Sequence, residues 1–507
     1  MEQKDIEKVQ AILRSDIKNS LKHGDIVQTI DLIDVFANST VQINNILCDD
    51  EIEEIIDLIS NQYIDINEDI QKGDDNIVVF YDQIGSTICL GEQYLRGLVA
   101  NGYKVIYIYE NKYRIDEGLL NDVKKLCNAY YFFKSNNVYQ GDEYLGNIIR
   151  KIIIRENPSK IICHSPAAGA LGMSVMSSIH GARKYRIVPG DHHFYIGRNC
   201  FDYFIEFRPF GWSTAIFERK IAPHKIYNLS YYPIVDDFCP FVGLPKETDD
   251  KIIFAVGGAN YKFQGSNAIS IIVERILLLC NHAVFVYLGQ PNKDIIRLIR
   301  KHHWENRIFL LGYRRDFAAV IRNVDILVNS YPFSGGLICQ TAAYYNKPIL
   351  AFSEKAFFEE ISVEHLLGNF TNSGKITFDS IDDVCQEAQR LVQDVSYRKE
   401  KGLMDNSMLQ TKETFNQQLY SILQGESNTL SEELVAYIDR TQRIKWYISI
   451  QNDFLPSSLL PILRYFRFKS FCKFYFLFGD MVKHFKYSIA QIMASYTFVR
   501  KVFHHET

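Results

Sequence analysis

The sequence predicts an α/β protein built from two tandem doubly wound domains, with a helical extension before them and a helical tail after them. Two observations lead to this prediction. Short apolar runs alternate with helical segments twice along the chain, and a stretch rich in Pro, Gly and Asp separates the two sets. Alternating strands and helices are typical of parallel sheets covered by helices on both faces. The length of 507 residues agrees with two large domains, because it exceeds what one hydrophobic core supports.

The first two regions cover residues 1–75 and 76–240. Residues 1–75 are acidic, carry apolar residues at helical spacing, and are expected to form an accessory region of short helices. Residues 76–240 are expected to form the first α/β domain. We place its strands at 77–81, 105–109, 130–133, 160–163 and 185–188, and its helices near 94–99, 115–127, 142–155 and 167–180.

The second α/β domain is expected at 250–425, after the linker sequence DDFCPFVGLPKETDD. We place its strands at 252–256, 284–288, 307–311, 324–328 and 348–352, and its helices at 266–280, 292–301, 315–322 and 337–345. Residues 430–507 form a separate tail in which aromatic and basic residues are interleaved.

Bulk composition is that of an ordinary globular protein, with 47% hydrophobic and 23% charged residues. The polar N-terminus, MEQKDIEKVQ, lacks the pattern of a signal peptide, and no stretch of about 20 apolar residues is present. The ten cysteines are scattered without a CxxC pair. We therefore expect a cytoplasmic protein with reduced thiols, no transmembrane helix and no metal site.

Two adjacent glycines, Gly335 and Gly336, lie between a buried strand and a helical segment in the sequence NSYPFSGGLICQTAA. The free N–H groups in the first turn of a helix bind anions, and glycine lets a phosphate come close to the backbone. Ligands of doubly wound sheets bind beyond the carboxyl ends of the strands. The pair therefore predicts a phosphate-binding helix start, with a tight turn as the alternative.

A second glycine-rich loop, GGANYKFQG, follows the first strand of the same domain and contains Gly258, Asn260 and Lys262. A lysine in this loop is well placed to neutralise a diphosphate. An exposed surface lysine is the alternative. Together with the glycine pair, the loop predicts a site for a diphosphate at the carboxyl edge of the second sheet.

A polar run in the first domain, Asp191-His192-His193, follows a Pro-Gly turn at the end of an expected strand. It should face the cleft between the domains, where a histidine can take a proton from an acceptor hydroxyl or donate a hydrogen bond to a phosphate. A structural role is the alternative for one of the histidines. Asp82, in the first turn after a strand of this domain, is a rival for the base, with capping of the next helix as its alternative.

Several of these motifs resemble a known family. The GGANYKFQG loop and the segment RIFLLGYRRDF…VDILVNSYPFSGGLICQTAAYYNKPILAF look like the donor-binding half of a GT-B glycosyltransferase. The segment VPGDHHFYIG…CFDYFI resembles its counterpart in the O-GlcNAc-transferase-like branch, and the retaining bacterial polysaccharide glycosyltransferases are the competing branch. The likeness covers roughly residues 76–425. It implies a GT-B fold of two Rossmann-like domains that bind a nucleotide-sugar between them, mostly without a metal ion.

The resemblance also implies residue roles in the second domain. Lys262 matches the lysine that grips the donor diphosphate, and Leu311–Arg314, with Gly312 and Tyr313, match the loop that cradles the base. The helix start that holds the distal phosphate corresponds to Ser334, Gly335, Gly336, Leu337 and Ile338. Gln340 and Thr341 stand where the family usually has a carboxylate for the ribose. Phe333 stands where the retaining branch has a second glutamate, which counts against that branch.

The tail carries an uneven charge. Residues 440–507 contain sixteen aromatic side chains, eleven Lys or Arg and three Asp or Glu. Two interpretations stay open: packing back onto the first domain, and contact with an anionic membrane surface at the inner face of the membrane. Nucleic-acid binding does not fit the glycosyltransferase interpretation.

The motifs lead to one expected function and two alternatives. We expect a metal-independent hexosyltransferase-type enzyme without a cofactor. It would move a sugar from a nucleotide-sugar, UDP-linked, to a hydroxyl or amide of a protein, lipid-linked glycan or cell-surface glycan. A glycosyltransferase-like partner protein without catalysis is the first alternative, motivated by Phe333 and Thr341. A nucleotide-sugar epimerase, which shares the two-domain layout, is the second.

Overall fold

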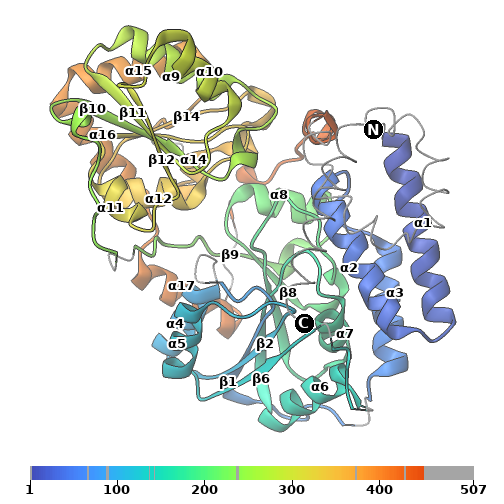
Figure 1. The fold of residues 1–507 in the computed structure, drawn as a ribbon. Coiled ribbons are helices and arrows are strands. Elements are labelled where there is room, and N and C mark those ends of the chain that lie inside the picture. Colours follow the sequence, from blue (N-terminus) through green and yellow to red (C-terminus); the bar gives the residue numbers. More distant parts are fainter. Residues whose placement is uncertain are drawn as a thin grey trace, which may run out of the picture.

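The computed structural model describes residues 3–65, 68–86, 91–135, 137–141, 143–235, 239–370, 374–426 and 430–449. Two α/β domains lie beside each other, and three N-terminal helices cover one side of the first domain (Figure 1). Each sheet has a buried hydrophobic layer on both of its faces, because helices pack against it from both sides.

The first domain is built on a seven-stranded parallel sheet with the order β3-β2-β1-β6-β7-β8-β9. Its strands are β1 (Asp74–Asp82), β2 (Lys104–Glu110), β3 (Ala129–Phe133), β6 (Pro158–His164), β7 (Arg183–Ile187), β8 (Tyr203–Glu206) and β9 (Ile226–Asn228). The strand order reverses between β1 and β6, and this reversal marks the point where doubly wound sheets bind ligands. The register places Asp82 beside His164 at this point.

Helices cover this sheet and extend it at the N-terminal side. The extension consists of α1 (Gln3–Lys22), α2 (Ile26–Ile43) and α3 (Asp50–Tyr63), and the domain helices are α4 (Gly91–Ala100), α5 (Glu117–Leu126), α6 (Leu145–Glu156), α7 (Ala170–Ser178) and α8 (Pro209–Phe217). Asp25 and Asp49 accept backbone N–H groups at the starts of α2 and α3, which explains where these helices begin. A small hairpin joins β4 (Tyr139–Gln140) and β5 (Glu143–Tyr144).

The second domain has a six-stranded parallel sheet with the order β12-β11-β10-β13-β14-β15. Its strands are β10 (Ile252–Gly257), β11 (Ala283–Leu288), β12 (Ile308–Gly312), β13 (Ile326–Val328), β14 (Ile349–Phe352) and β15 (Thr377–Phe378). Its helices are α9 (Ala268–Leu279), α10 (Lys293–His302), α11 (Phe317–Arg322), α12 (Gly336–Tyr344), α13 (Phe358–Ile361), α14 (Val363–Leu367), α15 (Ile381–Gln393) and α16 (Val395–Ser407). The order reverses between β10 and β13, so the loops after these two strands meet at the ligand-binding point.

The chain then returns to the first domain. Helix α17 (Lys412–Gln424) packs on α4, where Phe415 meets the ring of Tyr94 with centroids 5.2 Å apart. Residues 430–449 continue along the first domain and end in a helix at 441–449. We call residues 430–449 the strap. Its Ala436 N–H donates to Ser213 of the first domain at 3.3 Å.

The predicted fold class is confirmed: both sheets are parallel and doubly wound, and helices flank the first domain on its N-terminal side. Strands β8, β9 and β15 and helices α8 and α13 to α17 were not predicted. The three strands have two to four residues each, and the charged Glu206 ends β8, so no clear apolar run marks them. The N-terminal helices, expected to be short, run for 20, 18 and 14 residues.

Within the described ranges, no helix combines the length and apolar character needed to cross a membrane. The same ranges hold no group of three or more His, Cys, Asp or Glu side chains suited to a metal ion. Most of the tail for which membrane contact was predicted, residues 450–507, lies outside the described residues.

Candidate active site

Side chains shape the loop that leads into α12. Asn329, directly after β13, accepts the Gly335 N–H at 3.0 Å and donates to the Ser334 hydroxyl at 2.6 Å. The Ser330 hydroxyl donates to the Phe333 carbonyl at 2.7 Å. These bonds fix the loop and hold the first turn of α12 in place. Sequence reasoning missed Asn329; a polar residue at the end of a buried strand was the signal.

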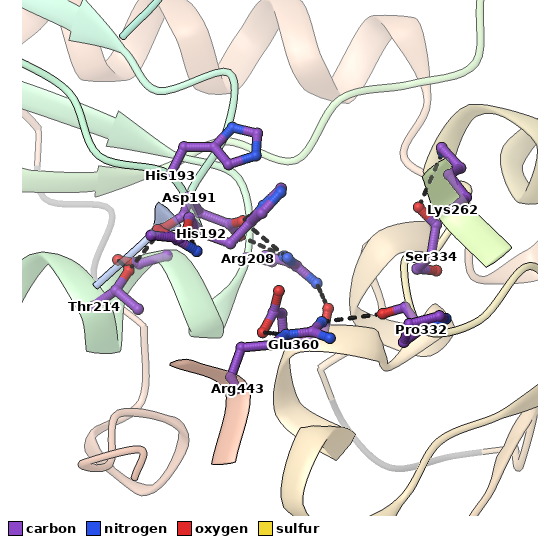
Figure 2. Close-up of polar contacts among 12 residues, drawn as sticks. Asp191, His192, His193, Arg208, Thr214, Lys262, Pro332, Ser334, Glu360 and Arg443 are labelled. Atoms are coloured by element: carbon purple, nitrogen blue, oxygen red, sulfur yellow. Dashed lines mark hydrogen bonds and ion pairs between the residues drawn. The ribbon is translucent and has the colours of Figure 1, made fainter. Parts of the chain in front are cut away.

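Lys262 lies in the loop after β10 and reaches the loop after β13 across the switch point, the place where the strand order of the sheet reverses. Its Nζ donates to the Ser334 carbonyl at 3.2 Å (Figure 2). The side chain is half-buried, and burial lowers the pKa of Lys262 below that of an ordinary lysine. In the described part of the chain no carboxylate pairs with it. A partly buried ammonium without a counter-ion, next to the start of a helix, is a place for an anion.

The glycines near Lys262 differ in whether the fold leaves room for a side chain at their positions. Gly258 has a φ of +149°, and a Cβ there would lie 3.2 Å from the Lys262 side chain, so the lysine folds over the glycine. A Cβ at Gly335 would lie 2.6 Å from Ile338, which is too close. A Cβ at Gly336 would meet its nearest neighbour, Leu366, at 3.6 Å, an ordinary contact. Packing therefore requires Gly335 but not Gly336, which leaves close approach of a ligand as a reason for Gly336.

The remaining predicted donor-binding residues of the second domain are spread between surface and interior. Tyr313 is 84% exposed and Leu337 is 43% exposed, while Gly312 has a φ of +65° with open space beside it. The Thr341 hydroxyl donates to the Leu337 carbonyl at 2.8 Å, inside the helix. The Asn260 Oδ1 is buried without a partner among the described residues.

Gln340 is buried, and its amide nitrogen donates to the carbonyls of Tyr231 at 3.2 Å and Leu366 at 3.1 Å. Because Tyr231 belongs to the segment that leaves the first domain, Gln340 ties the two domains together. The Gln340 amide nitrogen and the Thr341 hydroxyl donate within the protein, while Oε1 of Gln340 is buried without a partner among the described residues.

We call the segment Asp191-His192-His193 of the first domain the histidine loop. It is held in place through Asp191. This buried carboxylate accepts two bonds from Arg208, at 2.5 and 2.9 Å, and lies 3.2 Å from Nδ1 of His192. Burial alone would raise the pKa of Asp191, but Arg208 and then His192 hold it well below its ordinary value. Asp191 is therefore a charged group that holds His192 in place, and it is not a base that exchanges protons near neutral pH.

The two histidine rings of this loop lie against each other, with centroids 3.8 Å apart. The His192 side chain is 25% exposed, so one edge stays accessible. Burial, and then the neighbouring His192, lower the pKa of His193 well below 6.5. His193 is therefore a neutral imidazole at pH 7 and a weaker base than an ordinary histidine. Arg219 holds the loop backbone by donating to the carbonyls of Asp191 at 2.7 Å and His193 at 2.8 Å.

Asp82 lies in a different environment. It is 1% exposed, and its oxygens accept the Tyr107 hydroxyl at 2.6 Å and the backbone N–H groups of Ile84 and Gly85 at 2.8 and 3.1 Å. His164 lies 3.1 Å away. Although burial acts to raise it, the pKa of Asp82 lies below its ordinary value because of these partners. This geometry supports a role in building the first turn of the domain and gives no support to Asp82 as the base.

A chain of polar contacts through Arg208, Glu360 and Arg443 joins the histidine loop to the loop that leads into α12 (Figure 2). Arg208, which holds Asp191, also donates to the Glu360 carbonyl at 2.6 Å across the domain boundary. The Glu360 carboxylate accepts a 2.7 Å bond from Arg443 of the strap, and Arg443 donates to the Pro332 carbonyl at 3.1 Å. Sequence reasoning missed Arg208, Glu360 and Arg443, because nothing along the chain marks them as neighbours.

Phe333 packs in an aromatic cluster between the same loops. Its ring lies 4.9 Å from Trp446 and 5.7 Å from Tyr447 of the strap, and 6.3 Å from His192. The Arg443 guanidinium stacks over it at 5.2 Å. Where the retaining branch would have a carboxylate, this chain therefore has an apolar contact between the strap and the histidine loop.

Comparison with known proteins gives likeness at the level of fold. No model of a known protein family matches the chain, and no curated protein matches it either. Solved structures that it resembles include an O-GlcNAc transferase mutant of Thermobaculum terrenum, with 13% identity over 81% of this chain and 80% of the other, at a TM-score of 0.49. The fold itself is read from the structure, which has two parallel, doubly wound sheets in tandem and a C-terminal helix, α17, that returns to the first domain. The fold is GT-B.

Two further matches are similarly distant. HepE of Anabaena, crystallised with UDP and glucose, shares 12% identity over 69% of this chain and 99% of the other, at a TM-score of 0.49. A UDP-N-acetylglucosamine 2-epimerase assigned in Listeria monocytogenes shares 11% identity over 69% and 96%, at a TM-score of 0.46. At this distance the likeness carries nothing about the reaction, so function has to be argued from the site.

Proposed function

We propose that this protein is a glycosyltransferase that takes a sugar from a nucleotide-sugar, UDP-linked, and transfers it to a hydroxyl or amide of a protein or glycan acceptor. The observation that carries the proposal is Lys262, a half-buried cation without a carboxylate partner in the described ranges, placed over the start of α12. The ammonium and the helix start both favour a diphosphate, and they belong to the loops that meet at the switch point.

In the proposed reaction, Lys262 and the start of α12 act on the leaving group, which is the diphosphate. The bond between the anomeric carbon and the diphosphate breaks, and the departing diphosphate gains negative charge in the transition state. Lys262 and the N–H groups in the first turn of α12, which begins at Gly336, stabilise that charge more strongly than they stabilise the bound donor. Because a fixed cation and a helix start supply the positive charge, we expect the reaction to proceed without a metal ion.

The histidine loop acts on the acceptor, whose hydroxyl or amide attacks the anomeric carbon. His193 is neutral at pH 7 and His192 has an accessible edge, so either ring can take the proton of the acceptor as the new glycosidic bond forms. Asp191 does not take part in the proton transfer, because Arg208 holds it as a carboxylate. Its role is to position the loop.

The test compares Lys262→Ala with Lys399→Ala, an exposed lysine on α16 that serves as the control. Both proteins should fold, and Lys262→Ala should lose UDP binding in isothermal titration together with UDP-sugar turnover. Lys399→Ala should keep both. Turnover by Lys262→Ala at the parent rate would refute the assignment of Lys262.

The two alternative functions, a partner protein without catalysis and an epimerase, predict different outcomes for the same protein preparations. A partner protein without catalysis would show no transfer with any panel of UDP-sugars and acceptors, as followed by mass spectrometry. An epimerase would convert a UDP-sugar in the absence of acceptor, which NMR detects. Asp191 and Glu360, two carboxylates at the domain boundary, are each paired with an arginine, so neither is a free carboxylate for an epimerase.

A further inference from the structure

A cavity lies beside the proposed donor site, between the second domain and the strap. Its volume is about 300 Å³. It is lined by Gly265, Ser266, Tyr331, Pro332, Glu354, Phe357, Gln442, Lys445 and Trp446. The loops after β10, β13 and β14 form one wall, and the helix at 441–449 forms the other. None of these residues belongs to the predicted donor site.

The size of the cavity limits what it can hold. Ligand pockets typically measure about 300 to 1,000 Å³. At about 300 Å³ this one suits a single ring-sized molecule and is too small for a complete nucleotide-sugar.

The walls combine flat aromatic faces with a polar rim. Trp446, Phe357 and Tyr331 supply rings, while Glu354, Gln442 and Lys445 supply a carboxylate, an amide and an ammonium. A pyranose ring has the matching character: a face of C–H groups that packs on an aromatic ring, and an edge of hydroxyls that both donate and accept hydrogen bonds. One negative and one positive side chain in the lining balance each other, which favours a neutral sugar over a charged one.

Two polar groups of the lining point to a missing partner. The indole Nε1–H of Trp446 is buried without a hydrogen-bond partner among the described residues. Buried donors are rarely left unpaired, because the loss of hydration goes uncompensated. The Tyr331 hydroxyl is likewise buried without a hydrogen-bond partner among the described residues. Because Glu354 lines the same cavity, a phenol, an indole N–H and a carboxylate are available there to sugar hydroxyls.

The cavity shares its loops with the diphosphate site. Tyr331 and Pro332 lead directly into Ser334, and Ser266 follows the loop that carries Lys262. We propose that the cavity is a subsite for one neutral pyranose ring of the acceptor glycan. The proposal rests on the glycosyltransferase function proposed above, and it gives the strap a role as one wall of an acceptor site.

The strap holds this wall through Arg443. The guanidinium pairs with Glu360 and stacks 4.6 Å from the Phe357 ring and 4.9 Å from the Trp446 ring, so it links the two walls. The subsite therefore exists only while the strap is docked.

The test uses the full chain and saturation-transfer NMR with the methyl glycosides of glucose, galactose, N-acetylglucosamine and glucuronic acid. At least one neutral glycoside should give a signal in the parent protein. The signal should fall at least fivefold in Glu354→Gln and Trp446→Ala, and should be unchanged in Glu433→Gln, an exposed carboxylate of the strap. If Trp446→Ala fails to fold, Glu354→Gln decides, because that side chain is exposed and the change is isosteric.

Two results would overturn the subsite: no neutral glycoside binds the parent protein, or binding persists in both cavity variants. A glucuronide that binds more tightly than every neutral glycoside would overturn the choice of a neutral ring. UDP titrations of the same samples separate this proposal from the proposed function. The cavity variants should bind UDP as the parent does, whereas Lys262→Ala should lose UDP and keep the glycoside signal. A parent protein that binds glycosides but not UDP would refute the donor site. The cavity would then still be a sugar-binding site.

Discussion

Gly336 offers a perturbation in which ligand binding and stability should move in opposite directions. A Cβ at this position meets Leu366 at 3.6 Å and the Tyr231 hydroxyl at 3.8 Å, so Gly336→Ala fits the folded protein. The residue begins α12, where alanine is a better helix former than glycine. We expect the free energy of unfolding to stay unchanged or to rise by up to about 0.5 kcal/mol.

The added methyl group should cost binding because it occupies the approach of the phosphate to the helix start. A hydrogen bond to a charged group contributes about 1.5–3 kcal/mol. Loss of one such bond predicts a UDP affinity roughly 10- to 150-fold weaker, since each 1.4 kcal/mol is a factor of about ten. Isothermal titration measures the affinity, and thermal unfolding measures the stability of the same preparation.

Gly335→Ala is the matched comparison. Its Cβ would lie 2.6 Å from Ile338, so this variant should lose stability as well as binding. A Gly336→Ala protein that is as stable as the parent and binds UDP with the parent's affinity would refute the phosphate site at this helix.

Four further predictions concern pH, metal and the tail. If His193 takes the proton, the acid limb of kcat/KM should lie well below pH 6.5, because its pKa is lowered, and it should disappear in His193→Asn; a limb at pH 6.5 would exclude His193. Glu206 is fully buried with both oxygens unpartnered among the described residues, and burial raises its pKa to about 8. Between about pH 4.5 and pH 8 the folded protein keeps this proton while the unfolded chain loses it, so the parent should weaken across that window by a few kcal/mol, at about 1.4 kcal/mol per pKa unit, and level off above about pH 8. Glu206→Gln should flatten this dependence in thermal unfolding scans, and an identical pH profile would contradict the assignment. EDTA should leave turnover unchanged if Lys262 and the helix start supply the positive charge; activity lost on chelation and restored by a divalent ion would contradict this. Liposome flotation with and without residues 440–507 tests membrane contact, and recovery of both forms in the soluble fraction would exclude it.

The strand and helix pattern of the larger elements could be predicted because it is local. The apolar run at 77–81 lies within β1 and that at 284–288 within β11, since buried parallel strands need continuous apolar sequence. Strands β8 and β9 have four and three residues, too few to show a period. The sequence motifs also placed Lys262 and the glycine pair in two loops, and the structure joins them through Ser334.

The parts of the site that could not be predicted depend on long-range contacts. Arg208 and Glu360 are separated by 152 positions, and Arg443 and Pro332 by 111. An arginine or glutamate along the chain reads as a solvated surface residue until its partner is known. Asp191 was proposed as a catalytic residue on its position after a turn, and only the geometry of Arg208 shows that its charge is already neutralised.

The strap changes how the two domains can move. The chain passes between the domains three times: through the segment that carries Tyr231, on the way back to α17, and again between Ala436 and Arg443. Two domains joined by one connection can rotate far apart, whereas three connections restrict their relative rotation to a small angle. Opening must also separate Arg208 and Arg443 from Glu360, so under the proposed function the departure of the nucleotide requires these two contacts to break. The rate of release, and with it the turnover number, would then be set by the C-terminal strap as well as by the groups that hold the donor.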